Sequence, residues 1–156
     1  HADNYSLSFD GVDDYVDCGN NELFGPTQSN PLTISLWVKL NSLDNIIASK
    51  YESFNSNNSN FYIGTTGNGS FSVAGDGTNG FYFGTVELNE WQYVSVVFDN
   101  TTITNAYVNG NLENSGQINF APDVSILRSV RPTIMKKTHL AGLGSPRQGV
   151  CGGFGD

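Results

Sequence analysis

The chain of 156 residues suits a single domain and is short for two. Charged residues make up only 14% of it, which is too few for a long solvated helix or a coiled coil. Ala, Lys, Glu and Arg are scarce, whereas Val, Ile, Thr, Tyr, Phe, Gly and Asn are abundant, a composition typical of strands joined by turns. The net charge of −8 argues against nucleic acid as a partner of the whole chain.

The charge is distributed unevenly along the chain. Residues 1–127 contain 14 acidic and two basic side chains, whereas residues 128–156 contain one acidic and five basic side chains. The argument against nucleic acid therefore holds firmly for the acidic domain and lapses for the basic end. No apolar run approaches the roughly 18 residues needed to cross a bilayer, so no membrane span is predicted.

Strand patterns occur along most of the chain. Leu32–Leu40 alternates apolar and other side chains with a period of two, which predicts a strand with one buried face. Asn109-Gly110 follows an apolar run and predicts a type I′ hairpin turn, because that turn needs positive φ at both central residues. The other predicted strands are Ser6–Phe9, Asp14–Cys18, Ile46–Lys50, Phe61–Thr65, Ser70–Ala74, Phe81–Thr85, Trp91–Phe98 and Thr102–Val108. No segment has a helical period, so we expect an all-β antiparallel sandwich or jelly roll.

Four blocks of sequence, in order, resemble those of a known family. Ser8–Val16, Leu32–Lys39, Trp91–Asp99 and Tyr107–Gly110 are similar to blocks of the laminin-G-like, concanavalin-A-like jelly-roll domains. The resemblance covers Ser6 to about Leu127 and implies two packed antiparallel sheets in one domain. We therefore expect a single jelly-roll domain over residues 1–143, followed by a divergent Gly-rich tail at residues 144–156.

The C-terminal segment departs from the family pattern. Members of the family usually close the sheet with a strand that returns beside the first one, and only Leu140–Leu143 faintly resembles it. The residues after Leu143 lack alternation and contain too much Gly and Pro for a central strand. A lost closing strand would leave an open sheet edge, so we expect the tail either to be disordered or to make an intermolecular contact. This predicts a protein–protein or assembly module, including a homo-oligomer through that edge, as the alternative function.

Acidic residues gather around a glycine near the N-terminus. Asp10, Gly11, Asp13 and Asp14 lie within five residues, and Ca²⁺ prefers six to eight oxygen ligands of the kind such a turn exposes. The resemblance implies a structural calcium here, completed by an acid in the closing strand that this chain lacks. The alternative is that Asp10 closes an Asx-turn and that the other carboxylates are solvated.

Two predicted loops combine aromatic side chains with amides and carboxylates. Sugars are recognised by aromatic rings that stack on the pyranose and by polar groups that direct its hydroxyls. The candidate ligand-binding residues are Tyr51, Phe54, Asn55, Asp76, Asn79 and Tyr82. Phe81 and Tyr82 can equally be ordinary strand residues, one facing inward and one outward. Trp37 and Trp91 lie in or at the head of periodic strands and are interpreted as core or sheet-face packing.

The sequence lacks the carboxylate motif of the glycanases that share this fold. Those enzymes are expected to carry Glu-x-Asp-x-Glu on one strand face, and no such motif occurs here. Glu87 and Glu90 are three residues apart, a spacing that a strand would divide between its two faces. We therefore predict no enzyme activity, with glycoside hydrolysis as a remote alternative.

The remaining features concern the compartment. Cys18 and Cys151 lie far apart, so a single disulfide is left open without being implied, and no Cys/His spacing indicates zinc. A surface rich in Asn, Thr, Gly and Ser with little Lys is common in secreted proteins. The sequence thus predicts a secreted or cell-surface, non-catalytic module that binds a glycan or glycoprotein, with calcium as its expected ion.

Overall fold

The computed structural model describes residues 6–10, 14–16, 31–50, 61–75, 79–99, 103–119 and 138–141. Within these residues the chain forms strands and turns and no helix, so this part contains no helix that could cross a membrane. The strands are β1 (Leu7–Ser8), β2 (Leu32–Leu40), β3 (Ile46–Lys50), β4 (Phe61–Thr65), β5 (Ser70–Ala74), β6 (Gly80–Thr85), β7 (Trp91–Phe98), β8 (Ile103–Val108), β9 (Asn111–Gln117) and β10 (Thr138–Ala141).

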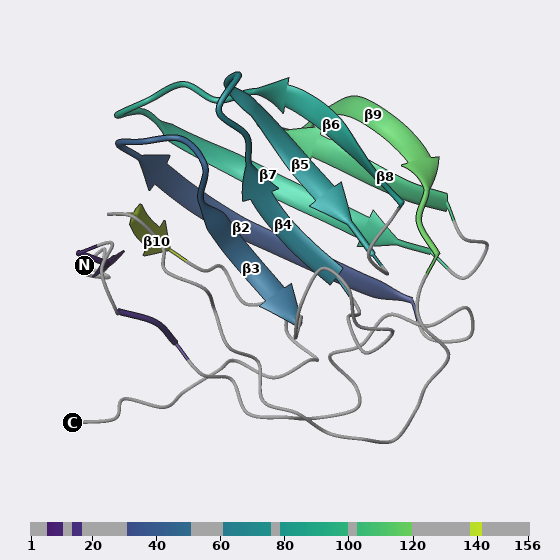
Figure 1. The fold of residues 1–156 in the computed structure, drawn as a ribbon, viewed down its shortest axis with the longest axis horizontal. Helices are drawn as coiled ribbons and strands as arrows, with labels where there is room; N and C mark the ends of the chain where they lie inside the picture. Colours follow the sequence, from purple (N-terminus) through teal and green to yellow (C-terminus); the bar gives the residue numbers. More distant parts are fainter. Residues whose placement is uncertain are drawn as a thin grey trace.

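The strands form two antiparallel sheets that pack face to face (Figure 1). One sheet has six strands in the order β1-β10-β2-β7-β8-β9, and the other has four in the order β3-β4-β5-β6. In the four-stranded sheet, each strand pairs with the one that follows it in the chain. β2 pairs with β7, so the whole four-stranded sheet lies between these two partners in the sequence. This two-sheet jelly-roll sandwich confirms the predicted fold class.

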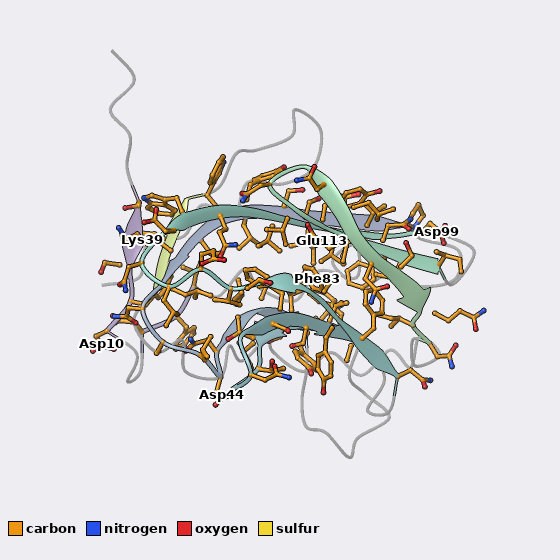
Figure 2. The ribbon with its side chains drawn as sticks, turned by 90° about the horizontal axis from the view of Figure 1, so that it is seen from above. Asp10, Lys39, Asp44, Phe83, Asp99 and Glu113 are labelled. Carbon is orange, nitrogen blue, oxygen red and sulfur yellow. The ribbon has the colours of Figure 1, made fainter. Side chains whose placement is uncertain are left out.

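The period-two pattern explains the core between the sheets. On β7, the buried residues Val94, Val96 and Phe98 alternate with half-buried ones, and β2 alternates in the same way from Leu36 to Leu40. From the four-stranded sheet, Phe71 and Val73 face them and are fully buried. Figure 2 shows Phe83 between the two layers. The central strands of both sheets therefore contribute one apolar face each to a shared interior.

The hairpin between β8 and β9 has the predicted turn. Asn109 and Gly110 both have positive φ, 51° and 84°, as a type I′ turn requires. Asn109 also accepts the Tyr93 N–H through its Oδ1 at 2.9 Å, so the turn is fixed to the neighbouring strand. β9 has the sequence Asn-Leu-Glu-Asn-Ser-Gly-Gln and is almost wholly exposed. It therefore has no apolar pattern from which the strand could be predicted.

Two sequence predictions for the sheet margins are wrong. Residues Asp14–Val16, at the start of the predicted strand Asp14–Cys18, are not in a strand, because Asp14 Oδ2 accepts the Asp10 N–H at 2.9 Å and closes a turn instead. The closing strand that the sequence prediction took as lost is also present, since the four residues of β10 pair with both β1 and β2. β1 is then an edge strand of the six-stranded sheet. The predicted tail and both cysteines lie outside the described residues.

Candidate functional site

Tyr82 is the described aromatic residue that the sheet presents most openly. It lies on β6, the edge strand of the four-stranded sheet, and its side chain is 61% exposed. Its neighbours Phe81 and Phe83 point the other way and lie 6.4 Å apart, ring centre to ring centre, beside the core. Strand alternation therefore turns Phe83, which is buried, and Phe81, which is partly buried, toward the core and the Tyr82 ring to the outer face. Of the two orientations that the sequence left open for Tyr82, the structure has the outward one, which a binding role requires.

Small residues lie beside Tyr82 on the same face. The register places Ser72 of β5 opposite Tyr82, and Gly64 of β4 opposite Ser72. Both residues are buried: Ser72 is 2% exposed, and the Asn45 carbonyl oxygen lies where a Gly64 side chain would be. Neither residue is therefore open to a ligand, and the exposed group next to them is the Tyr82 ring. An exposed aromatic ring of this kind can stack on a pyranose.

The backbone of the edge strand at Tyr82 is held by the other sheet. Asn114 of β9 donates from Nδ2 to the Tyr82 carbonyl oxygen at 2.8 Å, so an edge acceptor is satisfied. Asn79 precedes β6, and its carbonyl oxygen accepts the Gly75 N–H at 3.0 Å. Asn79 is thereby fixed at one end of the strand that carries Tyr82. Of the predicted ligand-binding residues, Tyr51, Phe54, Asn55 and Asp76 lie outside the described residues.

The predicted metal-binding turn is described only in part. Asp10 and Asp14 are exposed and are joined by the hydrogen bond from the Asp10 N–H to Asp14 Oδ2. Gly11 and Asp13 lie outside the described residues. Within the part of the chain that the structure describes, no three His, Cys, Asp or Glu side chains gather closely enough to hold a metal. One Asp14 oxygen thus closes the turn, and its second oxygen and the Asp10 carboxylate are the described groups that suit Ca²⁺.

Glu87 and Glu90 lie in a turn and not in a strand, unlike the strand that the sequence interpretation considered for them. They lie in the turn between β6 and β7, where the Glu90 N–H donates to the Glu87 carbonyl oxygen at 3.4 Å. A turn does not divide residues between two faces, so the argument from strand alternation does not apply to them. Both residues are exposed, as is usual for solvated turn carboxylates.

The outer face of the six-stranded sheet holds a group of aromatic residues that the sequence prediction did not treat as a site. Trp37 and Tyr93 are opposite each other on β2 and β7, with ring centres 5.4 Å apart, and Trp91 is 40% exposed. Tyr107 and Leu112 follow on β8 and β9. We call this group the aromatic face. The predicted sheet-face packing of Trp37 and Trp91 agrees with these positions. The alternation of Trp37 with core residues is the sequence pattern that indicates this face.

A protein-family model shows which family the chain is related to. The Laminin_G_3 model of the concanavalin A-like lectin/glucanases superfamily matches residues 10–129, which is more than half of the chain. The chain belongs to this superfamily. The predicted resemblance over Ser6 to Leu127 is therefore confirmed, and membership covers both lectins and glucanases by the superfamily's own description. No curated protein matches the sequence.

Solved structures similar to this superfamily member are distant in sequence. The botulinum neurotoxin serotype G binding domain is 15% identical, with a TM-score of 0.50; the match covers 89% of this chain and 42% of that one. The native heptameric SAP-like pentraxin of Limulus polyphemus is 14% identical with a TM-score of 0.46, over 94% and 61% of the two chains. At these identities the likeness concerns the fold alone. The chain spans less than two thirds of the length of either protein.

Proposed function

We propose that this chain is a non-catalytic, extracellular module that binds a glycan or the glycan of a glycoprotein. The observation that carries the proposal is the Tyr82 ring, which is 61% exposed on the outer face of β6. An aromatic ring that stands open on a rigid sheet is one element of sugar recognition. The predicted loop residues Tyr51, Phe54, Asn55 and Asp76, together with Asn79, would supply the polar groups that direct the sugar hydroxyls.

The non-catalytic part of the proposal rests on the carboxylates. The sequence has no Glu-x-Asp-x-Glu strand motif, and retaining or inverting glycosidases need two carboxyl groups at a defined separation across the scissile bond. Glu87 and Glu90 lie in an exposed turn between strands rather than on a sheet face. Among the described residues, no carboxylate lies on a strand of the four-stranded sheet that carries Tyr82, which favours binding over hydrolysis there. The location outside the cell is proposed from the composition described above.

Replacing Tyr82 with alanine should weaken glycan binding by about tenfold, equivalent to ~1.4 kcal/mol, because the stacking surface is removed. Tyr82→Phe should retain most of the affinity, because the ring remains. A glycan array read with and without calcium would identify the ligand, and titration calorimetry of that ligand would compare the variants. Since Tyr82 is 61% exposed, both variants should fold normally.

Tyr15 provides a matched control for this experiment. It is exposed to a similar degree, 57%, but lies next to the Asp10–Asp14 turn rather than on the four-stranded sheet. Tyr15→Ala should leave glycan affinity unchanged. An affinity lost in Tyr15→Ala and kept in Tyr82→Ala would contradict the proposed site, and an array silent in both conditions would contradict the proposed function.

We further propose that the Asp10–Asp14 turn binds a structural calcium ion. Excess calcium should then raise the melting temperature by about 5 °C or more, and EDTA should reverse the rise, because an ion that binds the folded state alone stabilises it. Asp14→Asn should abolish the response, since the amide oxygen can still accept the Asp10 N–H but has lost its charge. A wild-type melting temperature that neither calcium nor EDTA changes would refute the calcium site.

A further inference from the structure

The aromatic face is a second surface with a character different from that of the Tyr82 surface. It spans β2, β7, β8 and β9, and its side chains are those that alternate with the core residues of these strands. Leu112 at one side is 57% exposed and Trp91 is 40% exposed. Trp, Tyr and Leu side chains that stay partly in solvent on a flat sheet are typical of a surface with a partner.

Two pairs of polar side chains within this face are hydrogen-bonded to each other. Ser35 and Ser95 face each other on β2 and β7 with 2.8 Å between their Oγ atoms. Ser115 Oγ donates to Asn105 Oδ1 at 2.7 Å across β8 and β9. Hydroxyl groups that have partners can be covered at little desolvation cost, but they offer fewer free groups to a sugar. The face therefore suits a protein surface better than a glycan.

The Trp37–Tyr93 pair supports the same conclusion. Their rings are tilted by 47° with respect to each other rather than lying in one plane. A tilted pair does not make the flat platform on which a linear sugar chain stacks, whereas protein side chains pack into such irregular relief.

Among the residues that the structure describes, no carboxylate lies on this face, although the chain is strongly acidic. The Asp and Glu residues that the structure describes lie in the connections between strands, except for Glu113 on β9. Glu113 is the extra residue of the bulge in β9, and its Cγ lies close to Gly84 of β6, away from the outer face. In Figure 2 Asp10 and Asp99 lie at opposite ends of the sandwich, and Lys39 lies at one end of the six-stranded layer. Lys39 is the charged side chain that the described strands place on the outer face.

We propose that the aromatic face is the contact between two copies of this chain. With a net charge of −8, two copies repel wherever their carboxylates meet, and like charges placed opposite each other cost several kcal/mol. A symmetric dimer uses the same patch on both partners, so a face whose described residues carry no carboxylate is a place where such a contact avoids this repulsion. A basic partner would instead select the acidic connections between the strands.

The dimensions of the face set the expected strength of the dimer. Four strands about 4.8 Å apart and about seven residues along β2 give a patch of roughly 15 by 23 Å. This area is below that of a standard specific interface, so the dimer should be weak and reversible, with a dissociation constant in the micromolar to millimolar range. It should therefore be visible only as a dependence on protein concentration.

The experiment uses the full chain and two independent readouts. Sedimentation velocity from about micromolar to millimolar concentration should show a reversible monomer–dimer equilibrium. The two tryptophans of the chain, Trp37 and Trp91, both lie on this face, so their emission should move to shorter wavelength and their quenching by acrylamide should fall over the same range. Leu112→Glu, which places a carboxylate on each copy, should weaken the dimer by about tenfold or more.

Leu88→Glu is the matched control, because Leu88 is also exposed but lies in the turn between β6 and β7. It should leave the equilibrium unchanged, and melting temperatures would establish that both variants fold. A monomer at every concentration would overturn the proposal, which would leave the face to another occupant such as residues 120–137 that join β9 to β10. A dimer that Leu112→Glu does not weaken would also overturn it, as would a glycan that shifts the tryptophan emission of the monomer.

Discussion

Replacing Phe71 with alanine should lower the free energy of unfolding by about 3–5 kcal/mol, enough to unfold a large fraction of a marginally stable domain. Phe71 is fully buried on β5 and stacks on Phe83 of β6, with ring centres 5.6 Å apart and an angle of 23° between the rings. The substitution removes a whole ring from between the sheets, and the backbone ladders on both sides of β5 prevent the strands from closing the cavity. Urea denaturation followed by circular dichroism measures the loss.

Tyr82→Ala is the control for this prediction as well as the test of the binding site. It also removes an aromatic ring from the β5–β6 pair, but from the outer face, where the ring is mostly in solvent. Its cost should stay below about 1 kcal/mol, as for other exposed positions. If Tyr82→Ala destabilised the protein more than Phe71→Ala, the assignment of inner and outer faces on the four-stranded sheet would be wrong.

The second large effect is expected at Gln92, a buried polar residue on the inner side of β7. Its Nε2 donates to the Thr85 carbonyl oxygen at 2.9 Å, and its Oε1 accepts the Glu87 N–H at 2.8 Å. This side chain therefore ties the end of β6 to the six-stranded sheet. Gln92→Leu has nearly the same volume but leaves a backbone donor and acceptor without partners, at a cost of about 2–4 kcal/mol in unfolding free energy. Thermal and urea unfolding would measure it.

Gln117→Leu is the matched control for Gln92, because Gln117 is exposed on β9 and the chemical change is the same. Its effect should lie within about 0.5 kcal/mol of zero. Equal costs for the two variants would contradict a role of the Gln92 amide in connecting the sheets. Because β6 carries Tyr82, Gln92→Leu should also loosen the edge strand and weaken glycan binding without removing any group from the proposed site.

The central strands were predicted well, because burial of one face of a strand produces apolar residues with a period of two. Leu32–Leu40, Ile46–Lys50, Phe61–Thr65, Ser70–Ala74 and Trp91–Phe98 have the predicted bounds. The Asn109-Gly110 turn was predictable from its φ requirement. The sheet margins were less predictable. β9 is polar and β10 has only four residues, so both depend on pairing with a neighbour rather than on an apolar pattern of their own.

The candidate site was predictable only in its local chemistry. The outward direction of Tyr82 follows from its position between Phe81 and Phe83, but the alternation alone does not say which of the two faces is buried. The position of Ser72 opposite Tyr82 comes from cross-strand register, and the Asn114 contact joins residues 32 positions apart. The aromatic face likewise needs the register that places Trp37 beside Tyr93. Long-range pairing of this kind leaves no mark in a single stretch of sequence.

The most direct test of glycan binding at the four-stranded sheet is amide NMR of the chain titrated with the best ligand from the glycan array. Shift changes should centre on β5 and β6 around Ser72 and Tyr82, and the amides of Tyr93 and Tyr107 on the six-stranded sheet should stay unchanged. Shift changes confined to the six-stranded sheet would contradict the proposed site, because the glycan would then occupy the surface that we assign to a second copy of the chain.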